Sequence, residues 1–71
     1  MRILGIDPGT IVMGYGVVDS SGDSLKLVDF GTLNAPRSLP IPERLKLLYA
    51  GVSAVIERQR PDEAAFEESS P

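Results

Sequence analysis

The feature that most constrains this chain is a short apolar run near its start that stops at a carboxylate. Residues 3–6 are all apolar or glycine, and Asp7 follows them directly. A run without a polar position predicts a central strand that is covered on both faces. Pro8 and Gly9 come next and favour a sharp turn, because proline fixes φ and glycine tolerates positive φ. The first strand is therefore expected to end at Asp7.

Later patterns predict two more strands, a helix and a last strand. They cover residues 13–20 and 25–33, the stretch from Pro42 to just before Pro61, and residues 64–66. Short turns join the first three strands, which predicts an antiparallel meander. The helix carries one apolar stripe, at Ile41, Leu45, Leu48, Val52, Val55 and Ile56. A right-handed crossover through this helix predicts a fourth strand parallel to the first, giving an α/β fold with a mixed sheet.

Composition limits both the stability and the chemistry of the chain. Its 71 residues include no Cys and no His, which excludes disulfides, thiolate metal sites and histidine catalysis. A chain this short buries only about 60% of its unfolded surface, so we expect one marginally stable domain at most. No run resembles a signal peptide or a membrane span, which predicts a cytoplasmic protein. The net charge of −3 argues against a basic nucleic-acid surface, although a bound metal would neutralise acidic residues gathered in a site.

Two carboxylates are expected at a common edge of the sheet. Asp7 ends the first predicted strand and Glu67 ends the fourth, and parallel neighbours end on the same side. Oxygen-only ligands suit Mg²⁺ or Mn²⁺, and carboxylate-bound metal ions support phosphodiester cleavage. Simpler interpretations stay open, because Asp before Pro-Gly is a good turn former and an acidic residue near a terminus is often solvated.

Glycines on the second predicted strand suggest an open strip beside these carboxylates. Gly14 and Gly16 are two residues apart and so lie on one face, where a nucleic-acid backbone can approach. A bulge or a bend is the alternative reason for glycine at these positions. Thr10 is a candidate contact to phosphate, or it bonds to the turn that contains it. The arginines, including Arg58, form no evident patch and are expected to be solvated.

Three blocks of sequence resemble the N-terminal part of the RuvC family of Holliday junction resolvases. They read ILGIDPGT…GYGVV, RLKLLYAGV and PDEAAFE, in this order, and the likeness runs from Arg2 to Glu68. The resemblance implies a ribonuclease H-like fold and a Mg²⁺-dependent crossover junction endodeoxyribonuclease. It further implies a role in recombination and DNA repair, with a homodimer and a branch-migration helicase complex as partners of the complete protein.

The same resemblance assigns roles to individual residues. The first catalytic Asp of the family falls on Asp7 and its catalytic Glu on Glu67, and both would hold metal, with two ions per active site. Two further catalytic acids of the family lie far downstream. Residues 1–71 are therefore expected to form the N-terminal part of a single nuclease domain and to lack activity alone.

Two other classes share this fold and remain alternatives at this stage. Actin-like or Hsp70-like ATPases and sugar kinases open with an Asp-x-Gly-Thr turn that binds phosphate, which DPGT satisfies. YqgF-type nuclease-like proteins also open with Asp-x-Gly. The apolar, glycine-rich sequence after DPGT disfavours the ATPases, and the RLKLLYAGV helix disfavours the YqgF type.

Overall fold

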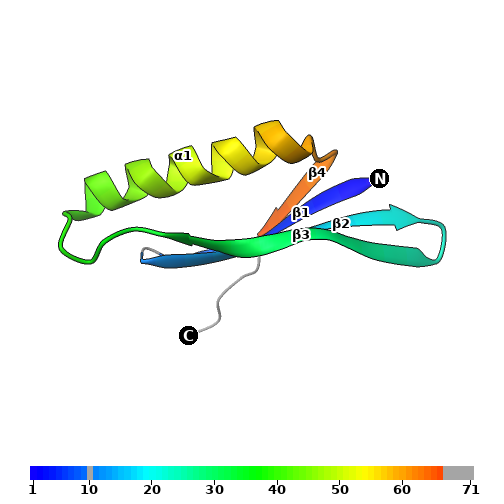
Figure 1. Ribbon diagram of the computed structural model, residues 1–71, viewed down its shortest axis with the longest axis horizontal. Helices are drawn as coiled ribbons and strands as arrows, with labels where there is room; N and C mark the ends of the chain where they lie inside the picture. Colours follow the sequence, from blue (N-terminus) through cyan, green and yellow to red (C-terminus); the bar gives the residue numbers. More distant parts are fainter. Residues whose placement is uncertain (10, 67–71) are drawn as a thin grey trace.

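The computed structural model describes residues 1–9 and 11–66 and has the predicted order of elements (Figure 1). These are β1 (Arg2–Asp7), β2 (Val12–Ser21), β3 (Ser24–Asn34), α1 (Ile41–Gln59) and β4 (Glu63–Phe66). The strands form one sheet in the order β3-β2-β1-β4. The first three pair antiparallel, and β4 pairs parallel to β1. The predicted meander with a parallel fourth strand is confirmed.

A tight turn and a bulge shape the hairpin of β2 and β3. Gly22 has a φ of 59°, and a glycine with positive φ at the start of a two-residue turn is typical of hairpins. The register then shifts between two neighbouring residues of β2, because Val17 pairs with Asp29 and Val18 pairs with Leu27. Val28 is the extra residue. This β-bulge is the physical reason why the alternation of β3 is blurred near Asp29.

The helix α1 lies across one face of the sheet (Figure 1). Proline stands in the first turn of α1. The residue that caps the C-terminal end of the helix is Arg60, which has the left-handed φ of 50° and donates its backbone N–H to the Ile56 carbonyl. Leu48 and Val55 are buried, whereas Leu45 is 50% exposed. The predicted stripe is therefore right in its centre, but its flanking members Ile41, Leu45 and Ile56 stay exposed. Among the described residues, no helix is both long and apolar enough to span a membrane.

The close approach of α1 to the sheet depends on a glycine. A Cβ built on Gly51 would lie 3.1 Å from Leu33 Cδ2, which is tighter than ordinary contact. Gly51 therefore lets the helix backbone pack closely against β3. Beneath the helix, Leu4, Ile6 and Val17 form the buried centre together with Val55.

The prediction that the first strand is covered on both faces is wrong for the described residues. Leu4 and Ile6 are buried beneath α1, but the alternating positions of β1 face the other side of the sheet. That open face carries exposed apolar side chains of β3, with Phe30 at 71% exposure. An apolar sequence shows that a side chain avoids water, but it does not show which segment covers it.

The turn after β1 has no room for a side chain at Gly9. A Cβ there would collide with the backbone carbonyl oxygen of Val12. We expect Gly9→Ala to lower the free energy of unfolding by about 1–3 kcal/mol, because the turn must shift to relieve the contact. Urea unfolding measures this change. Gly16→Ala is the matched control, since a Cβ at Gly16 meets nothing within 4 Å. Equal stability of the two variants would contradict this account of the turn.

Candidate metal and nucleic-acid site

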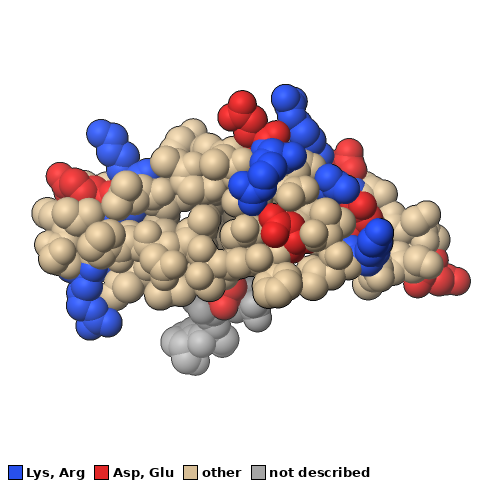
Figure 2. Space-filling model, in the orientation of Figure 1, with Lys and Arg blue, Asp and Glu red and all other residues tan. Residues whose placement is uncertain are grey.

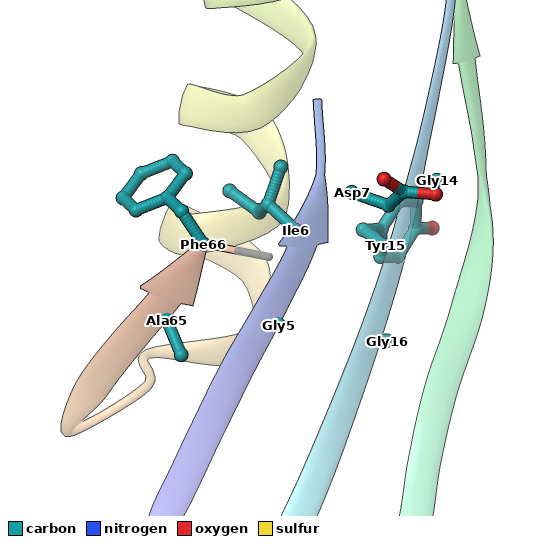
Figure 3. A pocket seen from close by; sticks show the side chains of 8 residues that line it. All are labelled: Gly5, Ile6, Asp7, Gly14, Tyr15, Gly16, Ala65 and Phe66. Carbon is teal, nitrogen blue, oxygen red and sulfur yellow. The ribbon is translucent and has the colours of Figure 1, made fainter. Parts of the chain in front are cut away.

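Asp7 is the last residue of β1 and lies on the open face of the sheet. It pairs with Gly14 of β2, and its carboxylate is exposed (Figure 3). On the other side of β1, the parallel strand β4 has Ile6↔Phe66 as its last described pair. The C-terminal ends of β1 and β4 therefore meet at one edge, where open α/β sheets bind ligands.

A depression of about 430 Å³ lies beside Asp7 (Figure 3). It is lined by Gly5, Ile6, Asp7, Gly14, Tyr15, Gly16, Ala65 and Phe66. A Cβ at Gly14 would lie 3.8 Å from the Cβ of Asp7, an ordinary contact, and one at Gly16 would meet no atom within 4 Å. No described atom therefore requires these two positions to be glycine, and their effect is to keep the strip beside Asp7 bare.

The structure brings some of the sequence-predicted site residues together. Asp7, Gly14 and Gly16 share one face of two neighbouring strands. Thr10 and Glu67 lie outside the described residues. Within residues 1–9 and 11–66, no three Asp, Glu, His or Cys side chains gather as a metal site would require. Asp7 thus offers a carboxylate oxygen at this edge, which is the type of donor that an ion such as Mg²⁺ prefers.

Charged side chains of both signs cluster near the C-terminal end of α1 (Figure 2). Arg58 Nη2 lies 3.0 Å from Asp29 Oδ2, and Gln59 Nε2 donates to the same oxygen at 3.2 Å. Arg58 also reaches the hydroxyl of Tyr15 at 3.4 Å. The expectation that Arg58 is merely solvated is wrong, because the bulge in β3 brings Asp29 within its reach.

Arg2 ties four segments together at the start of β1. Its Nε and Nη2 donate to the two carboxylate oxygens of Asp19 at 2.8 and 3.0 Å. Its Nη1 donates to the Gln59 carbonyl at 3.0 Å, which satisfies a terminal carbonyl of α1. Its backbone pairs with Asp62, just before β4. Sequence reasoning missed this cluster, although Arg2 and Asp19 stand at the ends of two strands predicted to pair.

These ion pairs shift the pKa of both carboxyl groups. The hydrogen bond from Arg2 lowers the pKa of Asp19 below its ordinary value, with a further contribution from the charges of Arg2 and Lys26. The hydrogen bond from Arg58 likewise lowers the pKa of Asp29. Both pairs are partly exposed, so solvent screening reduces what they contribute to stability.

The order of strands, the crossover helix and the acidic end of β1 define a ribonuclease H-like fold. The same architecture is found in the Thermus thermophilus RuvC structure, with a TM-score of 0.87 and 32% identity, covering 100% of this chain and 45% of that one. The structure of T. thermophilus RuvC in complex with Holliday junction substrate matches with a TM-score of 0.87 and 35% identity, over 96% of this chain and 42% of the other.

Sequence comparison gives the family. The family described as crossover junction endodeoxyribonuclease RuvC matches residues 3–69, and the chain belongs to the RuvC family. The RuvC protein of Chloroflexus aggregans is 59% identical over 68 residues, which are 96% of this chain and 42% of that protein. The RuvC protein of Dehalococcoides mccartyi is 55% identical over 67 residues, or 94% of this chain and 41% of that protein. The chain thus spans less than half the length of these relatives. These matches give no support to the ATPase, sugar-kinase or YqgF alternatives.

The two ion pairs make stability depend on pH. A carboxyl group whose pKa is lowered by folding contributes stability above its unfolded pKa, near 3.8, and loses it as the pH falls through the folded pKa. We expect Asp19→Asn and Asp29→Asn to be less stable than the wild type at pH 7, with the difference shrinking as the pH falls below 3.8 and through the lowered pKa of each carboxyl group. Urea unfolding at a series of pH values measures this. Asp23→Asn, in the exposed hairpin turn, supplies the baseline, and a difference that persists unchanged in acid would contradict the assignment.

Proposed function

We propose that the full-length protein containing this segment is a Mg²⁺-dependent endonuclease that resolves four-way DNA junctions in recombination and repair. The observation that carries this proposal is the exposed Asp7 at the end of β1, beside the parallel strand β4 and a bare strip of sheet (Figure 3). Membership of the RuvC family supports the choice of junction DNA as substrate, and the T. thermophilus relative has been solved with that substrate.

We infer that Glu67 joins Asp7 as the second acidic residue of the site. The last described pair of the parallel ladder is Ile6↔Phe66, and each of these residues is followed in the sequence by a carboxylate. Two such charges about 4 Å apart would repel by about 4 kcal/mol at an effective dielectric constant of 20. A divalent cation between them offsets this repulsion, which is why we expect them to hold metal together.

Asp7 and Glu67 would hold Mg²⁺, and Mn²⁺ can replace it because both ions prefer oxygen ligands. In a two-ion site, metal supplies activation of water and stabilisation of the leaving oxygen. The family resemblance implies two further acidic ligands downstream of this segment. We therefore propose that residues 1–71 are the N-terminal part of one nuclease domain and do not cleave DNA by themselves.

The bare strip gives the DNA backbone a way to approach Asp7. Gly14 and Gly16 leave the part of the open face of β2 nearest Asp7 without side chains, and we propose that a DNA strand passes there, with Thr10 near a phosphate. Metal bound at Asp7 would relieve the repulsion between phosphate and a chain with a net charge of −3.

The proposed partners and location of the complete protein rest on the family. Paired cuts across a symmetric junction require two active sites, so we propose a homodimer. We also propose association with a branch-migration helicase complex. Because a nuclease of this family acts on bacterial DNA, we expect it in the cytoplasm.

The metal site can be tested in a full-length protein that carries this segment. We expect Asp7→Asn and Glu67→Gln each to reduce junction cleavage more than about 100-fold, since even residues that only support metal ligands typically contribute 10- to 100-fold. Junction binding should be largely retained. Single-turnover cleavage and a gel-shift assay measure the two properties, with Asp23→Asn as the charge-matched control. Normal cleavage by either variant would remove that residue from the site.

The DNA path can be tested with a side chain placed in the bare strip. Gly16→Val fits the described structure, because nothing lies within 4 Å of the new Cβ, and valine favours a strand. We expect an unchanged or higher unfolding midpoint and weaker junction binding or cleavage. Ser20→Val adds valine to the same face of β2, four residues further from Asp7, and should leave both activities intact. Equal activity of the two variants would place the DNA elsewhere.

A further inference from the structure

The strand β4 has few features of its own that would fix its register against β1. Among the described residues it has four members, it forms one edge of the sheet, and all four are exposed. Two of them are alanines, which offer little surface for packing. Register is weakly specified where a strand buries no distinctive side chain. Among the described residues, the contacts just before β4 are therefore the ones that can set its register.

Asp62 makes two short hydrogen bonds to one residue of β1, just before the ladder begins. Its backbone N–H donates to the Arg2 carbonyl at 2.7 Å. Its side-chain Oδ2 accepts the backbone N–H of Arg2, also at 2.7 Å. The first ladder pair, Ile3↔Glu63, follows immediately. The contact between Asp62 and Arg2 thus continues the pairing of β4 with β1 by one residue beyond the ladder. In this contact the acceptor for the Arg2 N–H is the Asp62 carboxylate instead of a backbone carbonyl.

The connection between α1 and β4 is short and conformationally restricted. Only residues 60–62 separate α1 from β4, and they include the left-handed Arg60 and then Pro61. The end of α1 is itself held, because Arg2 Nη1 donates to the Gln59 carbonyl. Arg2 therefore holds both ends of this connection. Asp62 is the residue that is held beside β1 directly before the first ladder pair of β4.

We propose that Asp62 is a positioning residue that sets the register of β4 and thereby brings Glu67 beside Asp7. This inference rests on the nuclease site proposed above. A shift of one residue would turn the side chains of β4 to the opposite face, and a shift of two would move them about 6.6 Å along β1. Two oxygens on one Mg²⁺ lie within about 4 Å of each other, so either shift breaks a shared site.

Two measurements on a full-length protein that carries this segment test the proposal. The first is the Mg²⁺ concentration for half-maximal junction cleavage, which we expect Asp62→Ala to raise about tenfold, as loss of support for a metal ligand typically does. The second is the set of backbone nuclear Overhauser contacts between Gly5 and Ala65, which report the register without any cleavage. These contacts should weaken in Asp62→Ala.

Matched variants separate positioning from general stability. Asp62→Asn keeps a side-chain oxygen that can accept from Arg2 and should restore both readouts, whereas Asp23→Ala removes an exposed carboxylate elsewhere and should change neither. If Asp62→Ala does not fold, Asp62→Glu moves the acceptor by one methylene and should raise the Mg²⁺ midpoint in its place.

The outcomes distinguish this inference from the proposed function. Unchanged Gly5–Ala65 contacts in Asp62→Ala, or no rescue by Asp62→Asn, would overturn the role of Asp62. A wild-type protein that does not cut junctions would instead overturn the nuclease proposal, while the backbone contacts would still decide the register.

Discussion

The burial of β1 and β2 beneath α1 is the contact on which the rest of the structure depends. Leu4 and Val17 are fully enclosed there, and burying a side chain of this kind stabilises by about 1.5–3 kcal/mol. With α1 held across the sheet, the chain leaves the helix near the start of β1. The next strand can then only run in the same direction as β1. The parallel pair of β1 and β4, and the common edge at which Asp7 lies, follow from this packing.

The two ends of β1 differ in the surroundings of their charged side chains. At its start, Arg2 contacts Asp19, the end of α1 and Asp62, so the position of three other segments is fixed there. At its other end, Asp7 stands exposed beside glycines, with space around it. A strand of six residues thus connects a place where charges are paired to a place where, among the described residues, no ion pair holds the carboxylate.

Much of the fold could be predicted because its signals are local. Proline at the start of the helix, proline after it and glycine in the hairpin mark real boundaries, and the abrupt stop at Asp7 marks the end of β1. The bulge could not be predicted, since one extra residue has no fixed composition, and neither could the Arg58–Asp29 pair that depends on it. The contribution of Glu67 and Thr10 stays a prediction.

The bulge at Val28 also reverses the alternation of side chains along β3. Leu27 pairs with Val18 and Asp29 pairs with Val17, so these two residues of β3 lie on opposite faces of the sheet although they are only two positions apart. In a regular strand they would share one face. If the register of the hairpin turn continued without a bulge, Asp29 would lie opposite Gly16 on the open face, away from Arg58. The irregular pairing, as much as the identity of the residue, is what this hairpin must keep for its carboxylate to face the helix.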